Sequence, residues 1–343
     1  MVLKFILIGG VLPGALCAVA LLVTCLVFRA GGRFKIPPSV FPILLALSIL
    51  PAEVLAHGGW PRLLHWPKNA GDRILHTTIV AGIAGSLIGL VSHLLASRRR
   101  AALIRPAPSC DGSLALNSRL SLGATLLLSA PTCAATFWMF LSYRMAGHWK
   151  SAATAAAWIA VFVLVAIVMI AALELASRRR RIIDTARAAP SRDPAPVAVA
   201  FIAANALPLV ILDSGNAYIS QLCGGVVAAI GAALVAAALI PGFSLARGGN
   251  TAVVAALATM GLAGFYFGDD PEPLIPMLLI AAAPLVAGLT LCLFLSAADM
   301  WKRLLVGGAI AALLAGSAVA VQFAATPEAP ADSSGADDPY QLQ

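Results

Sequence analysis

The stretch that decides the fold is Ala152–Arg181, which reads AATAAAWIAVFVLVAIVMIAALELASRRRR. About 25 apolar residues are followed by four consecutive arginines. An α-helix of this length crosses a hydrocarbon core of roughly 30 Å even when it is tilted. The arginines cannot enter lipid without a cost of several kcal/mol, so they keep their end of the helix at the cytoplasmic surface. The segment therefore predicts a membrane-spanning helix of defined direction.

The composition of the whole chain agrees with an integral membrane protein. Of its 343 residues, 60% are hydrophobic and 11% are charged, and the mean hydropathy is +0.93. Soluble domains carry about 25% charged residues, so lipid must be the solvent for most of this surface. The net charge of +8 does not indicate nucleic acid, because 20 of the 23 Lys and Arg precede Pro194 and most lie between apolar runs. We expect these basic connectors to attract anionic lipid headgroups.

Apolar runs of spanning length recur along the chain and predict an all-α polytopic bundle of about ten transmembrane helices. The expected spans lie at about 5–28, 36–56, 76–96, 120–143, 152–177, 197–212, 219–240, 251–267, 274–298 and 304–325. The chain then divides into a five-helix half (1–185), a Pro-rich cytoplasmic linker (186–196), a second five-helix half (197–325) and an acidic tail (326–343). The tail lacks the apolar residues needed to fold.

Charge assigns an orientation to this bundle. The connectors after the odd-numbered spans are net basic, whereas the later even-numbered connectors and the tail are acidic. Two arginine clusters are expected to face lipid headgroups at the basic side: Arg98, Arg99, Arg100, Arg178, Arg179, Arg180 and Arg181. The positive-inside rule places both termini outside, and the alanine and arginine bias favours a bacterial inner membrane. Arg73 and Arg144 depart from the rule, because they lie in connectors assigned to the outer side.

No motif in the chain is specific for a catalytic or cofactor-binding class. The sequence contains no P-loop, zinc-protease, nucleophile-elbow or haem-attachment signature. The six cysteines form no CxxC pair and mostly fall in apolar runs, where they are typical of small packing residues. We therefore predict no cofactor, and an enzyme is a weaker interpretation than a non-catalytic membrane protein.

Prolines and one amide inside the spans favour a carrier of a small solute or ion. Asn205 and Pro208 interrupt one span, and Pro131 and Pro284 fall near the middle of the fourth and ninth spans. Two five-span halves would have inverted topology, in which broken helices at matching positions line a substrate site near the bilayer midplane. Glu53 is a further candidate for the substrate pathway, because carboxylates within spans are rare and usually functional. Packing kinks are the alternative interpretation of the prolines.

Histidines support a different hypothesis, a metal-dependent membrane enzyme, which ranks third. His57, His65, His76 and His148 all fall on the predicted outer side, where imidazoles can coordinate zinc, copper or haem iron. Glu53 and His57 lie four residues apart on one helix face and can relay a proton or hold a cation. Side chains that simply reach the headgroup region explain the same residues without a function.

The scarcity of charge within the spans favours a non-catalytic scaffold or subunit of a membrane complex, which ranks second after the carrier. Gly85 and Gly89 form a GxxxG pattern, which suits either self-association into a homo-oligomer or close packing inside one bundle. The three classes predict different structures. A carrier needs a polar midplane cavity, a metal enzyme needs three converging imidazoles, and a scaffold predicts an apolar groove or a lipid-facing cleft.

Overall fold

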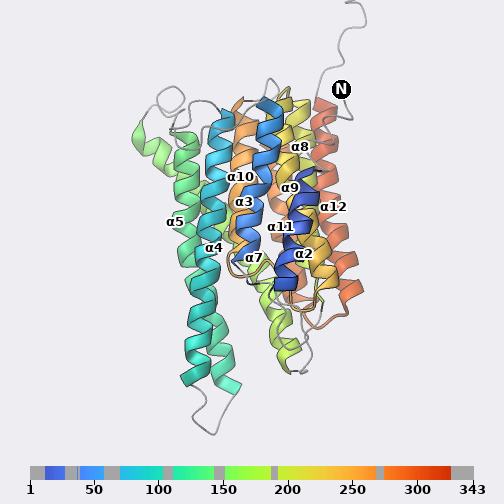
Figure 1. Ribbon diagram of the computed structural model, residues 1–343. Helices are drawn as coiled ribbons and strands as arrows, with labels where there is room; N and C mark the ends of the chain where they lie inside the picture. The colour runs from blue at the N-terminus through green and yellow to red at the C-terminus, as the bar shows by residue number, and fades with distance from the viewer. Residues whose placement is uncertain are drawn as a thin grey trace, which may run out of the picture.

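The computed structural model describes residues 12–27, 37, 39–57, 70–102, 111–142, 151–186, 192–267 and 274–325. These residues form ten helices and no strands (Figure 1). The helices are α2 (Leu12–Val27), α3 (Val40–His57), α4 (Ala70–Ala102), α5 (Asp111–Leu141), α7 (Ala152–Ala186), α8 (Ala195–Asp213), α9 (Ala217–Leu239), α10 (Gly249–Phe267), α11 (Leu274–Leu293) and α12 (Met300–Ala325). Eight are long and apolar enough to cross a membrane, and α2 and α3 are shorter. The predicted all-α fold is confirmed over these residues, and the count of ten spans stays a prediction.

Three helices extend well past the length that a bilayer requires. Helices α4, α5 and α7 contain 33, 31 and 35 residues, and 35 residues correspond to about 52 Å of helix. The clusters Arg98–Arg100 and Arg178–Arg181 were expected in connectors but lie on the helices α4 and α7. Alanine, leucine and arginine are good helix formers, so the helix continues beyond the apolar segment instead of ending with it.

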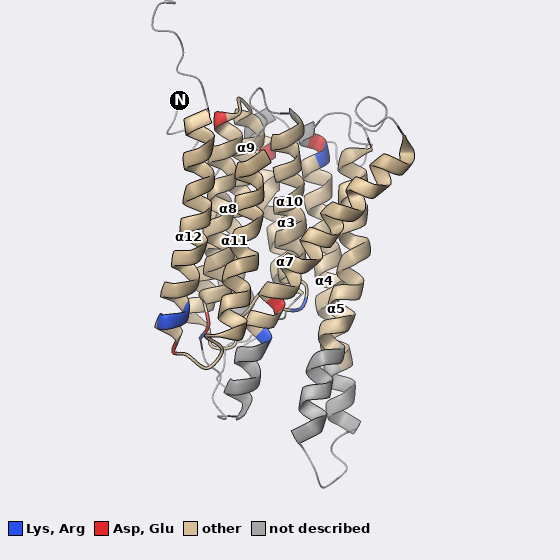
Figure 2. Cartoon of the chain, turned by 180° about the vertical axis from the view of Figure 1, so that it is seen from behind, with Lys and Arg blue, Asp and Glu red and all other residues tan. Residues whose placement is uncertain are grey.

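Successive helices run in opposite directions, which gives the bundle two chemically distinct ends. Hydrogen bonds place the last turns of α7 beside the starts of α10 and α12. We call this the arginine end, defined by Arg178, Arg247 and Arg303. Helix α12 runs from there to the opposite end, so its last turn and Arg178 of α7 lie at opposite ends of the bundle (Figure 2). This arrangement is the one that alternating spans require.

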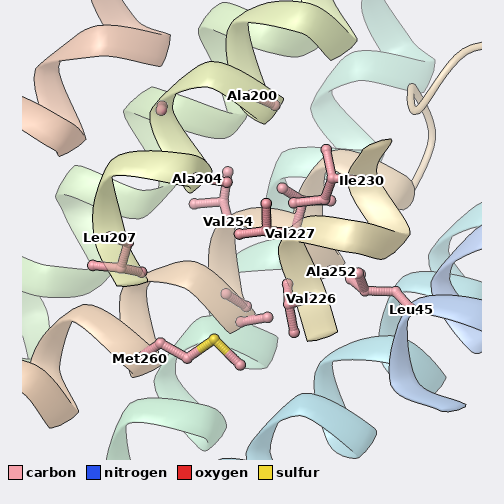
Figure 3. Close-up of a cluster of buried hydrophobic side chains, with 14 of the residues drawn as sticks. Leu45, Ala200, Ala204, Leu207, Val226, Val227, Ile230, Ala252, Val254 and Met260 are labelled. Carbon is pink, nitrogen blue, oxygen red and sulfur yellow. The ribbon is translucent and has the colours of Figure 1, made fainter. Parts of the chain in front are cut away.

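Helices α8, α9 and α10 build the centre of the molecule, and small side chains let them approach closely. Ala204 of α8, Val226 of α9 and Ala252 of α10 belong to one buried cluster with Leu45 of α3 (Figure 3). Helix α10 also packs on α4, α9 on α2 and α3, and α11 on α7. Helices from the two predicted halves therefore share a common core.

The GxxxG pattern of α4 is used inside this bundle. Gly248, in the connector before α10, has φ +109°, and a Cβ atom there would lie 2.0 Å from the backbone oxygen of Gly85. A Cβ atom on Gly85 would in turn meet the backbone oxygen of Gly248 at 2.7 Å. Only glycine on both sides permits this approach. The two glycines join the start of α10 to the middle of α4.

Helix α7 crosses one face of the bundle obliquely (Figure 2). Near its beginning it contacts α5, where the rings of Phe162 and Phe137 meet edge to face at 6.5 Å. Nearer its end it contacts α11, where a Cβ atom on Gly288 would lie 3.1 Å from the backbone carbon of Ala172. We call this contact the α7–α11 crossing. Helix α7 stays beside α5 near its end as well, where Arg178 bonds α5. It meets α11 at the crossing and separates from α11 towards its own beginning, where residues of both helices line a cavity.

Candidate functional site

An apolar cavity of about 460 Å³ occupies the space where α7 and α11 separate. Helix α7 forms one wall with Val161, and α11 forms the other with Leu278. Helices α8 and α10 form the floor, where Ala204 and Ala258 contribute small side chains. We call this cavity the α7–α11 cleft. Its volume falls in the range typical of small-molecule sites.

The cleft opens on an apolar surface of the bundle. Val161 and Leu278 on its rims are 48% and 60% exposed, and both lie in helices with the composition of membrane spans. The side chains that line the cleft are almost all aliphatic or aromatic. A buried water needs two to four polar partners, so these walls do not hold water. Hydrocarbon is the chemistry that matches them.

A buried polar cluster lies directly beyond the cleft at the arginine end. Glu174, fully buried on α7, accepts a hydrogen bond of 2.7 Å from Nε of Arg178 and one of 2.7 Å from the backbone N–H of Arg247. Nδ2 of Asn250, in the first turn of α10, donates to the same carboxylate at 3.1 Å. Arg247 has φ +68°, which a non-glycine residue rarely adopts. The carboxylate thus fixes the start of α10 to α7.

Hydroxyl groups continue this cluster into the neighbouring helices. The guanidinium of Arg178 donates to Ser121 at 3.1 Å and to Thr125 at 2.9 Å, both on α5. Thr125 lies 3.3 Å from the hydroxyl of Ser92 on α4. One turn further along α5, Ser129 pairs with Thr251 of α10 at 2.7 Å. Polar contacts therefore join α4, α5, α7 and α10 near the arginine end.

A second buried ion pair fixes α12. Arg303 is fully buried, and its Nε and Nη2 donate to the two carboxylate oxygens of Asp193, at 3.2 and 2.9 Å. Nη1 donates to the backbone oxygens of Leu291 and Leu295, and Nη2 also reaches that of Ala176. The five hydrogen bonds match the five N–H groups of a guanidinium. Arg303 thereby connects α12 with α7, α11 and the segment before α8.

Polar contacts also occur at the opposite end. Glu53 of α3 is 1% exposed and accepts a hydrogen bond of 2.5 Å from the hydroxyl of Tyr218 on α9. Arg73, in the first turns of α4, is buried and donates to the backbone oxygen of Met139 and to Ser142. Arg73 thus binds the end of α5, where a helix carries partial negative charge. This contact explains a cation on the side that the sequence assigns to the exterior.

The five candidates for a substrate pathway do not converge. Pro284 is buried and lines the α7–α11 cleft. The side chain of Asn205 is exposed and bonds the backbone oxygen of Phe201 within its own helix, and Pro131 is exposed on α5. The backbone oxygen of Pro208 accepts a hydrogen bond from Ser220 of α9. Glu53 lies at the opposite end and is not among the residues that line the cleft.

The metal hypothesis falls largely outside the described residues. His65 and His148 lie outside them, as does the side chain of His57. The ring of His76 is half-buried, and its Nδ1 lies 2.5 Å from the backbone oxygen of Asp72. Among the residues that the structure does describe, no three His, Cys, Asp or Glu side chains gather in a way that could hold a metal ion.

One of the seven clustered arginines, Arg178, is buried, which the sequence does not indicate. Arg178, expected at the headgroups, is buried against Glu174 and α5 because it lies on the protein-facing side of α7. The side chains of the other six clustered arginines lie outside the described residues. Glu174 and Arg178 lie four residues apart on α7, a spacing that allows an ion pair, and the structure contains that pair. Sequence reasoning missed Asn250, Arg303 and Asp193, although polar and charged residues next to spans were the available signal.

Comparison with known proteins identifies no relative. No protein-family model matches the chain, and neither a curated protein nor a solved structure matches it.

Proposed function

We propose that this protein binds the hydrocarbon chain of a membrane amphiphile in the α7–α11 cleft and acts as a non-catalytic, lipid-binding membrane component. The observation that carries the proposal is a dry cavity of about 460 Å³ that opens sideways between two apolar helices. An empty cavity costs stability, because its lining atoms lose their van der Waals contacts. In a bilayer the neighbouring lipid chains are the nearest material that can restore those contacts.

Photo-crosslinking tests this proposal directly. The full-length protein is reconstituted into lipid nanodiscs that contain a phospholipid with a diazirine in one acyl chain, and labelled peptides are identified by mass spectrometry. We expect labelling at Val161, Ala281 and Leu278 of the cleft to exceed labelling at Ala309, which is exposed on α12 outside the cleft. Equal labelling of the cleft and of the α12 surface would show that lipid contacts both without a binding site.

Two matched variants sharpen the test. Ala281→Phe places a ring in the cleft, and Ala309→Phe places the same ring on the exposed face of α12. We expect the first variant to lower cleft labelling severalfold and the second to leave it unchanged. Loss of labelling in both variants, or in neither, contradicts the proposal. Thermal unfolding of each variant in detergent verifies that it is folded.

A carrier is the second candidate function, with an amphiphile as the cargo that the cleft suits. The observation in its favour is Pro284, a buried proline in the wall of the cleft. Proline lacks an N–H, so the carbonyl of Ile280 loses its usual helical donor and α11 can bend at this point. Carriers commonly use such interrupted helices near the substrate. A polar solute would require polar walls, which the cleft does not have.

Transfer between leaflets separates the two candidates. In proteoliposomes that contain a fluorescent-headgroup lipid, a carrier accelerates the movement of the label from the inner to the outer leaflet, which a membrane-impermeant quencher detects. Pro284→Ala is then expected to slow transfer while the acyl-chain crosslinks remain. A rate equal to that of protein-free liposomes removes the carrier and leaves the binding protein.

We also propose that the arginine end lies in the cytoplasm and that both termini lie outside, in a bacterial inner membrane. The excess of Lys and Arg in connectors on that side supports this orientation. Reporter fusions to Gln343 test it, because a reporter that is active only outside the cytoplasm should be active there. Activity of a cytoplasmic reporter at the same position would reverse the orientation.

A further inference from the structure

The α7–α11 cleft has a closed end and an open end. At the closed end the backbones of α7 and α11 meet at Ala172 and Gly288. Leu173, the last residue of α7 that lines the cleft, is 1% exposed, and Glu174 follows it inside the polar cluster. Arg303 also bonds the backbone oxygen of Ala176, so α7 is held on the far side of the crossing. A chain that enters the cleft meets backbone atoms here.

The open end carries aromatic side chains with polar atoms. Trp158 lines the cleft near the beginning of α7, is 47% exposed and stacks on Phe162 at 5.8 Å between ring centroids. Across the cleft, near the end of α10, Phe265 and Tyr266 meet edge to face at 5.0 Å. Trp and Tyr concentrate where the membrane meets water, since each combines an apolar ring with a hydrogen-bonding group. A polar headgroup suits this end.

The length of the cleft exceeds the depth of one leaflet. From Trp158 to Leu173 the wall of α7 extends about 22 Å, and from Tyr266 to Val253 the floor of α10 extends about 20 Å, at 1.5 Å per residue. Half of a 30 Å hydrocarbon core is about 15 Å. Because α7 runs obliquely, these values are path lengths along the helices, and a chain that follows them is at least as long as one leaflet is deep. A chain that fills the cleft is long and extended.

We propose, on the basis of the lipid-binding function above, that the cleft binds one long hydrocarbon chain end-on. The headgroup lies beside Trp158 and Tyr266, the chain terminus reaches Leu173, and the α7–α11 crossing sets the longest chain that fits. The ligand class is a long-chain amphiphile, of which a linear acyl chain and an isoprenoid chain are two sources. Two amphiphile series, one linear and one isoprenoid, distinguish them.

The experiment uses two probes of equal chain length, one with the diazirine next to the headgroup and one with it at the chain terminus. In the reconstituted full-length protein, the headgroup probe should label peptides that contain Trp158 and Tyr266. The terminal probe should label peptides that contain Leu173 and Ala200. The same peptides labelled by both probes would overturn the end-on orientation while leaving the cleft as a binding site. No cleft labelling by either probe would overturn the proposed function itself.

A chain-length series tests the role of the crossing. Ala200, buried on α8, lines the closed end of the cleft, and Ala200→Leu shortens the space available. We expect this variant to reduce competition by the longest amphiphile about tenfold and to leave the shortest unaffected, since overpacking costs this much. Ala309→Leu, the same substitution on the exposed face of α12 outside the cleft, should leave the length profile unchanged. An unchanged profile in Ala200→Leu with a normal unfolding temperature contradicts the proposal.

Discussion

Two parts of α7 differ sharply in what they contact. Between Ala172 and Arg178 the described side chains are buried or half-buried, and Glu174 joins α7 to α10 through charge and hydrogen bonds. Between Trp158 and Val165, side chains such as Leu164, which is 64% exposed, face lipid or the cleft. Polar contacts are strong where hydrocarbon excludes water. An apolar side chain gains about as much from contact with lipid as from contact with another helix, so it has little preference for either. One helix is therefore fixed at its end and loosely packed nearer its beginning.

The largest loss of stability is expected when Arg303 is replaced, because this residue joins α12 both to Asp193 and to the fixed part of α7. Arg303→Ala leaves Asp193 without its cation and should lower the free energy of unfolding by about 3–5 kcal/mol. Thermal or denaturant unfolding in detergent micelles measures the change. Lys302→Ala is the matched control, because Lys302 is the exposed neighbour of Arg303. This variant should leave the free energy of unfolding unchanged. Equal losses in both variants would show that the ion pair is not what holds α12.

The next largest effect is expected at Glu174. Glu174→Gln removes the charge that pairs with Arg178 but keeps an oxygen that can accept from the backbone N–H of Arg247. A loss of about 1.5–3 kcal/mol follows from the value of hydrogen bonds to charged groups. Glu174→Ala should cost more, because it also leaves the donors of Asn250 and Arg247 without an acceptor. The same cost for both variants would show that the neutral acceptor contributes nothing.

Gly248 tests how closely the connector before α10 must approach α4. Gly248→Ala places a methyl group against the backbone oxygen of Gly85 at a residue with positive φ, and should cost about 1–3 kcal/mol. Gly316→Ala on α12 is the contrasting variant, because no atoms lie within 4 Å of its Cβ position. In a helix that substitution should stabilise by about 0.5–1 kcal/mol. If the two variants change the free energy of unfolding in opposite directions, the close approach is confirmed. A change in the same direction contradicts it.

The smallest effect is expected in the loosely packed part of α7. Leu164→Ala should change the free energy of unfolding by less than about 0.5 kcal/mol, because lipid contacts this side chain in place of protein. The same unfolding assay measures it. A loss above about 1.5 kcal/mol would mean that a second protein surface covers Leu164, which would remove the contrast between the two parts of α7.

The all-helical membrane architecture could be predicted from the sequence, because a long apolar run indicates a helix that is surrounded by lipid. The runs at about 152–177 and 197–212 were identified by length and composition alone, and the structure contains the apolar helices Ala152–Arg178 and Ala195–Asp213 there. The outer boundaries were less accurate, since α4 and α7 continue as helices through residues that are too polar for lipid. Charged residues mark where a helix leaves the bilayer, but they do not show where the helix itself ends.

The site was harder to predict, for a physical reason. Small and apolar residues such as Ala204 and Gly261 carry no chemical signature, so a cavity formed by the oblique path of α7 is invisible before the helices are packed. Pro131 and Pro284 look alike in sequence, yet the first is exposed and the second is buried in the cleft wall. The role of each proline depends on whether it lies on the side of its helix that faces other helices. A uniformly apolar sequence does not show which side that is.

Arg303 constrains the order in which the protein is assembled. All of its partners precede it in the chain, so Asp193 is synthesised long before its cation emerges from the ribosome. Until the last helix arrives, that carboxylate has no buried counter-charge and favours the aqueous surface of the membrane. A nascent chain that stops before Met300 therefore lacks the cation that pairs with Asp193 in the finished molecule.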